Sequence, residues 1–154
     1  VVNLFMMFEP LKARRHVEVT DRRARKDFSQ CIGELVDVHY PDSEKIVLVM
    51  DNLNTHSAGS LYEAFEPAEA RRLAERLEIH HTPKHGSWLN MVEIEIGILS
   101  RQCLSRYIPA KQRMAREVGA WEARRNQASA SVDWQFTAAD ARLKLKKLYP
   151  VIQE

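Results

Sequence analysis

The segment that decides the fold class reads Lys45-Ile46-Val47-Leu48-Val49-Met50-Asp51-Asn52. An unbroken apolar run flanked by polar residues is typical of a strand buried on both faces, and such strands are central and parallel to a neighbour. The run ends at Asp51, and open α/β sheets place their functional sites at the carboxyl ends of their strands. We therefore expect an α/β domain in which Asp51 is held rigidly and points into a crevice.

Strand and helix patterns alternate on both sides of this segment. Strands are expected at residues 1–8, 16–20 and 77–81, with the first two joined as a hairpin near Pro10. Helices are expected at about 21–39, 57–65, 67–76, 89–108, 110–127 and 137–148, the first of them capped by Thr20 or Asp21. This order predicts an α/β or α+β domain with a mixed sheet and flanking helices, with Trp121 and Trp134 in its core.

Composition sets limits on the class of protein. The chain has 154 residues, of which 45% are hydrophobic, and this is enough for one domain with one core. The formal net charge is only +2, but lysines and arginines cluster in residues 12–26 and 142–147, which fits either a phosphate-binding surface or a solvated face. Cys31 and Cys103 lie at apolar helical positions, so we expect buried thiols in a reducing cytoplasm. No apolar run approaches the roughly 20 residues that span a bilayer.

A second group of chemistry-bearing side chains follows a loop that contains Pro83 and Gly86. The loop leads into a helix whose first turns carry Asn90 and Glu93, which are three positions apart and project on one helical face. Glu93 stands among apolar residues, where an unpaired carboxylate is costly and a metal ion would remove the cost. The alternative for Glu93 is a glutamate that is stabilised by the helix dipole. The alternative for Asp51 is an aspartate that starts an Asx-turn. Glu95 is a possible substitute that should face away from Glu93.

The two segments together resemble the mariner-type insertion-sequence transposases, a branch of the DDE superfamily. Residues 47–56 are similar to the strand that carries the second aspartate of that family, with an apolar run, Asp51-Asn52 and then His56. Residues 83–93 are similar to its third-acid motif, of the type Pro-x-x-Ser-x-x-Leu-Asn-Pro-Ile-Glu. The likeness covers essentially the whole chain, including residues 3–10 and 121–126.

The resemblance implies an RNase H-like fold and a DNA transposase that cleaves and rejoins phosphodiesters with two divalent cations held about 4 Å apart. It implies Asp51 as a ligand of one ion and Glu93 as a ligand of the other, with Mg²⁺ or Mn²⁺ as the cofactor. The expected partners are DNA, both transposon ends and target, and a second copy in a homodimer, in the cytoplasm with the nucleoid. The side chains expected to contact DNA are Asn52, Lys84, His85, Asn90, Arg22 and Arg23; a solvated lysine and plain loop histidines, His56 among them, are the alternatives.

The family pattern also has a first aspartate on a first strand, and this sequence offers no match for it. Glu9, at a hairpin turn, and Glu18 and Asp21, outside any comparable apolar strand, are poor replacements. We therefore expect residues 1–154 to form a partial RNase H-like catalytic domain without the amino-terminal DNA-binding region. The sheet would be split where the first strand belongs, leaving two open edges that either pair directly or dimerise.

Three functions fit these expectations. The first is a transposase catalytic domain, in which Mg²⁺-dependent cleavage is weak or absent because one shared ligand is missing. The second is a catalytically inactive, truncated remnant that binds DNA or oligomerises. The third is an unrelated RNase H-like nuclease, which should lack the motif from Leu89-Asn90 to Glu93.

Overall fold

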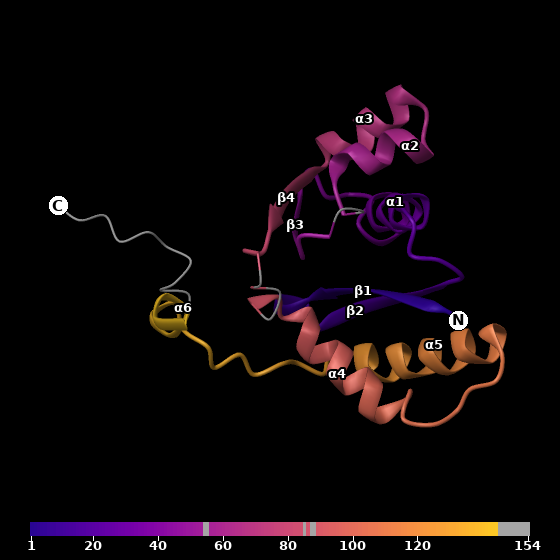
Figure 1. Ribbon diagram of the computed structural model, residues 1–154, viewed down its shortest axis with the longest axis vertical. Helices are drawn as coiled ribbons and strands as arrows, with labels where there is room; N and C mark the ends of the chain where they lie inside the picture. Colours follow the sequence, from indigo (N-terminus) through magenta and orange to yellow (C-terminus); the bar gives the residue numbers. More distant parts are fainter. Residues whose placement is uncertain (54–55, 85, 87–88, 145–154) are drawn as a thin grey trace.

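The computed structural model describes residues 1–53, 56–84, 86 and 89–144 (Figure 1). Strands and helices alternate along it, so the expected α/β class is confirmed, and the arrangement is consistent with an RNase H-like domain. In chain order the elements are β1 (Asn3–Glu9), the 3-10 turn η1 (Pro10–Lys12), β2 (Arg14–Thr20), α1 (Arg25–Glu34), the π-helical turn η2 (Leu35–His39), β3 (Ile46–Met50), the 3-10 turn η3 (Ala58–Ser60), α2 (Leu61–Ala64), α3 (Pro67–Glu75), β4 (Leu77–His81), α4 (Val92–Gln102), α5 (Lys111–Gln127) and α6 (Ala138–Lys144).

The strands form two separate sheets of two strands each. β1 and β2 are an antiparallel hairpin, with Asn3 opposite Thr20 and Glu9 opposite Arg14. β3 and β4 pair in parallel, as expected. In the part of the chain that the structure describes, no ladder joins β1 to β3, so direct pairing of these two edges is not observed. The split between the hairpin and the parallel pair is the split that the sequence predicts.

The hairpin is packed on both faces, because successive side chains of a strand point to opposite sides. Leu4 and Met6 pack against the cluster of α4 and α5, in which Leu99 and Trp121 are buried. Phe5, from the same strand, packs on the other cluster, which is built from α1, α2, α3 and the parallel pair. Figure 1 shows the hairpin between these two layers of helices. The fold therefore has two cores that share one strand.

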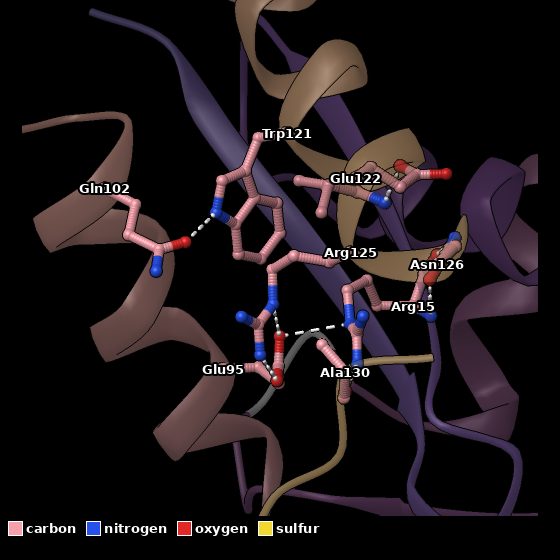
Figure 2. A network of polar contacts seen from close by, with 9 residues as sticks. Arg15, Glu95, Gln102, Trp121, Glu122, Arg125, Asn126 and Ala130 are labelled. Atoms are coloured by element: carbon pink, nitrogen blue, oxygen red, sulfur yellow. Dashed lines mark hydrogen bonds and ion pairs between the residues drawn. The ribbon is translucent and has the colours of Figure 1, made fainter. Parts of the chain in front are cut away.

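The outer edge of β2 is sealed by side chains of α5. The backbone N–H of Val17 donates to Oε2 of Glu122 at 2.9 Å (Figure 2). One helical turn later, Asn126 bonds both backbone groups of Arg15, accepting from its N–H at 2.8 Å and donating to its carbonyl at 2.8 Å. Unpaired edge groups of a strand recruit further strands, so this helix closes the sheet on that side.

The expectation that β3 is buried on both faces is wrong. Met50 lies in the core and Ile46 and Leu48 pack against it, but Val47 is 63% exposed and Val49 is 49% exposed. A continuous apolar run carries no alternation, so the sequence does not distinguish one covered face from two. The core-facing residues are sufficient to hold the strand in place.

The expected bounds of two helices are also wrong. α1 begins at Arg25, where the N–H of Ala24 donates to Oδ2 of Asp27 at 3.0 Å, and not after Thr20 or Asp21. The hydroxyl of Thr20 donates instead to the carbonyl of Arg22, in the irregular stretch before the helix. α4 is shorter than expected at both ends and covers Val92–Gln102.

The expected core holds in part. Trp121 is 1% exposed, whereas Trp134 is partly exposed and packs edge-on against Phe136, with ring centroids 6.0 Å apart. Cys31 and Cys103 are buried free thiols, and burial raises the pKa of Cys31 to about 12. The end of the last expected helix, at 145–148, lies outside the described residues. None of the described helices is long and apolar enough to cross a membrane.

Two histidines stack where the hairpin meets the end of η2. The rings of His16 and His39 lie 3.6 Å apart and 21° from parallel, and Nδ1 of His16 is 3.6 Å from Oε1 of Glu122. Burial, with the neighbouring His16, lowers the pKa of His39 below its ordinary 6.5. The folded protein therefore favours the neutral form of this ring.

This stack predicts that the protein loses stability on mild acidification. The unfolded chain binds the His39 proton more readily, so the stabilising contribution is complete above its unfolded pKa of 6.5 and is lost as the pH falls below it. Urea unfolding should show a lower midpoint at about pH 5.5 than at about pH 7.5, and His39→Gln should reduce the difference. His80→Gln, at an exposed histidine, serves as the control. An identical pH dependence in His39→Gln would contradict the prediction.

Candidate metal and nucleic-acid site

Asp51 directly follows the last residue of β3, at the carboxyl end of the parallel pair. The pairing is extended by one bond there, because the N–H of Thr82 donates to the carbonyl of Met50 at 2.8 Å. The carboxylate of Asp51 is 30% exposed, and its Oδ1 lies 2.6 Å from Nδ1 of His56. The strand fixes the backbone, and the histidine fixes one carboxylate oxygen.

His56 is itself held from several sides. Its ring stacks on Phe28 of α1, with centroids 4.8 Å apart and planes 25° apart, and lies 6.2 Å from the ring of Phe5 on β1. Its carbonyl oxygen is 2.9 Å from Nε2 of His81. The sequence favours a plain loop histidine here, but in the structure this ring connects the candidate carboxylate Asp51 to the core.

Glu93 lies in the first turn of α4 and is exposed. The expectation that apolar neighbours bury this carboxylate is wrong, because its side chain is exposed. Its backbone N–H donates to the carbonyl of Asn90 at 3.0 Å, and the side-chain oxygen of Asn90 accepts from Val92 N–H at 3.3 Å. Glu95 is the carboxylate that is fully buried, and it faces away from Glu93 as expected.

One cleft of about 820 Å³ is lined by both candidate carboxylates. Its walls are β1, β3 and the start of α4, and its lining includes Asp51, His56, Asn90 and Glu93. The cleft is lined by β1 and β3, which are not paired with each other, and its two candidate acids come from a strand end and a helix start. An acid pair from segments far apart in the sequence thus shares one opening.

The expected DNA-contacting residues are only partly gathered there. Asn90 and Arg23 line the cleft. Arg22, Asn52 and Lys84 are exposed but are not part of its lining. His85 lies outside the described residues.

The two carboxylates are the type of ligand that a hard divalent cation prefers, but they are too few to form a complete site. Carboxylate oxygens are the ligands that Mg²⁺ and Mn²⁺ prefer, and both Asp51 and Glu93 reach solvent. Among the described residues, however, no group of three or more histidine, cysteine, aspartate or glutamate side chains is placed to hold a metal. The two carboxylates could supply part of a coordination shell, with water completing it.

Comparison with known families gives the class of this domain. A model of the DDE superfamily endonuclease matches residues 1–115, from the start of the chain into α5, and this segment contains both Asp51 and Glu93. The chain therefore belongs to the DDE superfamily endonuclease family, whose chemistry is that of transposase-like nucleases acting on DNA. No curated protein and no solved structure matches the chain.

The contacts of His56 predict two separable effects. His56→Ala removes the stacking on Phe28 and should lower the free energy of unfolding by about 1–3 kcal/mol in urea denaturation. His56→Phe keeps an aromatic ring there and should retain most of the stability, while it releases the carboxylate of Asp51. Equal destabilisation by both variants would show that the bond to Asp51, and not the stacking, carries the effect.

Proposed function

We propose that the chain is the catalytic domain of a mariner-type DNA transposase, which cleaves and joins phosphodiesters of an insertion sequence with Mg²⁺ or Mn²⁺. The observation that supports this best is the shared cleft of Asp51 and Glu93, in a chain whose family is the DDE superfamily endonuclease. The two carboxylates come from the two sequence motifs that resemble mariner-type transposases.

The residues of the chain have distinct parts in this proposal. Asp51 and Glu93 would hold the metal, while His56 keeps Oδ1 of Asp51 in place. When bound, the ions activate water or a DNA 3′-hydroxyl and stabilise the leaving oxygen. Arg23, exposed at the cleft, is placed to neutralise a phosphate of the DNA backbone.

The proposed DNA surface is wider than the cleft. Asn90 belongs to its lining, and Arg22, Asn52 and Lys84 are exposed for contact with the DNA backbone. Backbone contacts of this kind position a nucleic acid without reading its sequence.

The alternative is a remnant that binds DNA or oligomerises without cleaving it. It is favoured by the shortage of ligands, since the described residues contain no third carboxylate grouped with the first two. Metal binding and cleavage are therefore separate questions for this chain, and each needs its own measurement.

Metal binding tests the proposal directly. The whole chain should bind Mn²⁺ in calorimetric titration, and Asp51→Asn and Glu93→Gln should each weaken binding roughly tenfold or more. Glu66→Gln, an exposed glutamate at the start of α3 outside the cleft lining, should bind like the wild type. Equal binding by all four proteins, or none by the wild type, would contradict the proposed site.

A cleavage assay can exclude the remnant. Because the described residues supply two carboxylates, Mg²⁺-dependent nicking of plasmid DNA by the chain alone should be weak or absent. Robust nicking that Asp51→Ala abolishes would show that two carboxylates are sufficient, and would exclude the remnant.

The open edges of β1 and β3 also support the proposed homodimer. Each carries backbone groups without a strand partner among the described residues, and such edges pair readily with another chain. Sedimentation velocity should show a dimer, and Met6→Pro on β1, which lies opposite Val17 and has its N–H on the open edge, should shift it toward monomer. A wild-type chain that stays monomeric at high concentration would exclude closure by dimerisation.

A further inference from the structure

The face of α4 turned away from the cleft is joined to α5 by paired polar side chains. On α4, Glu95 and Gln102 are seven positions apart and so lie on nearly the same side of the helix. Nη2 of Arg125 donates to Oε1 of Glu95 at 2.8 Å, and the indole N–H of Trp121 donates to Gln102 Oε1 at 2.9 Å (Figure 2). The buried Leu99 fills the space between these two contacts. Helix α4 is thus hydrogen-bonded to α5 at two points along one face.

Glu95 also binds the hairpin. Nε of Arg15 on β2 lies 3.1 Å from Oε2 of Glu95, and both side chains are fully buried. Arg15 further donates from Nη2 to the carbonyl of Ala130, and its guanidinium lies 5.2 Å from the centroid of the Phe8 ring. The carboxylate of Glu95 therefore links α4 to β2 and α5, and Arg15 extends the link to the segment after α5 (Figure 2).

The charges of this cluster do not balance, since one carboxylate stands between two guanidinium groups. Burial lowers the pKa of Arg15, and the charge of Glu95 opposes that effect. Among the described residues, Nε and Nη1 of Arg15 have no hydrogen-bond partner of good geometry. Buried ion pairs of this kind contribute little net stability compared with apolar packing, and some of them instead fix a particular geometry.

The geometry that this cluster fixes is the rotation of α4. Residues two positions apart on a helix point roughly 200° apart around its axis. When Glu95 is held in the interior, Glu93 is therefore directed to the opposite side, which is the cleft. A small rotation of the helix would move the Glu93 carboxylate away from the ions it is proposed to hold.

We propose that Glu95, clamped by Arg15 and Arg125, is a positioning residue that fixes the rotation of α4 and so places Glu93 in the cleft. The proposal rests on the proposed metal-binding function of Glu93. It also gives Trp121 and Arg125 of α5 a role, since neither residue takes part in the proposed metal binding.

Two variants test the clamp, each with a matched control in the full chain. Glu95→Gln removes the charge, and its control is Glu117→Gln, a glutamate of α5 that also pairs with two arginines, Arg106 and Arg113. Arg125→Lys keeps the charge but loses the two-pronged contact, so it remains informative if Glu95→Gln does not fold. Its control is the exposed neighbour Arg124→Lys.

The first readout does not depend on metal. Both native thiols are buried, so nitroxide labels can be attached to Ser100→Cys on α4 and Ala68→Cys on α3, both exposed positions. Pulsed electron paramagnetic resonance should give one narrow distribution of the distance between the two labels, in the otherwise wild-type protein and in both controls. The clamp variants should broaden or shift it. An unchanged distribution in Arg125→Lys and in any folded Glu95→Gln would overturn the proposal.

The second readout is Mn²⁺ affinity, which should fall roughly tenfold or more in the clamp variants and stay within about twofold of the wild type in the controls. If Asp51→Asn and Glu93→Gln abolish binding while Arg125→Lys and any folded Glu95→Gln bind normally, the clamp is overturned and the proposed site stands. If Asp51→Asn and Glu93→Gln have no effect, the proposed site fails, and the distance distributions still decide whether Glu95 orients α4.

Discussion

The ion pairs of Glu95 fix how β2, α4 and α5 are oriented in the half of the molecule that they form. They join β2, α4 and α5 at a single buried carboxylate, in a place where ordinary apolar contacts would allow a helix to slide or rotate. Apolar packing has little directional preference, whereas a carboxylate held by two guanidinium groups accepts few orientations. The position of Glu93 in the cleft therefore depends on charges on the other side of its helix.

Much of the fold could be predicted from sequence, because local patterns decided it. The bounds of β4 and the start of α3 at Pro67 follow from turn and cap residues that act over a few positions. The exposure of Val47 and Val49 could not be predicted, because it depends on whether another element covers them. The start of α1 differs from the expectation for a local reason, because Thr20 donates to the carbonyl of Arg22 and Asp27 caps the helix.

The candidate site shows the same division. Asp51 and Glu93 could be named from their motifs, and the structure lines one cleft with both. Two neighbours could not be identified as important from the sequence alone. His56 has its place through Phe28, which is distant in the sequence, and Glu95 differs from Glu93 only in the side of the helix it occupies. A carboxylate among apolar residues predicts a buried acid, but the helical phase decides which acid is buried.

Because side chains of α5 bond the outer edge of β2, the hairpin can pair with another strand on one side only. Glu122 and Asn126 occupy backbone groups that another strand would need, so the hairpin offers only its β1 edge. A hairpin with one usable edge can end a sheet but cannot sit in the middle of one. Pairing of β1 with β1 of a second copy therefore stops after a single addition, which favours a closed pair of molecules over an open-ended fibre.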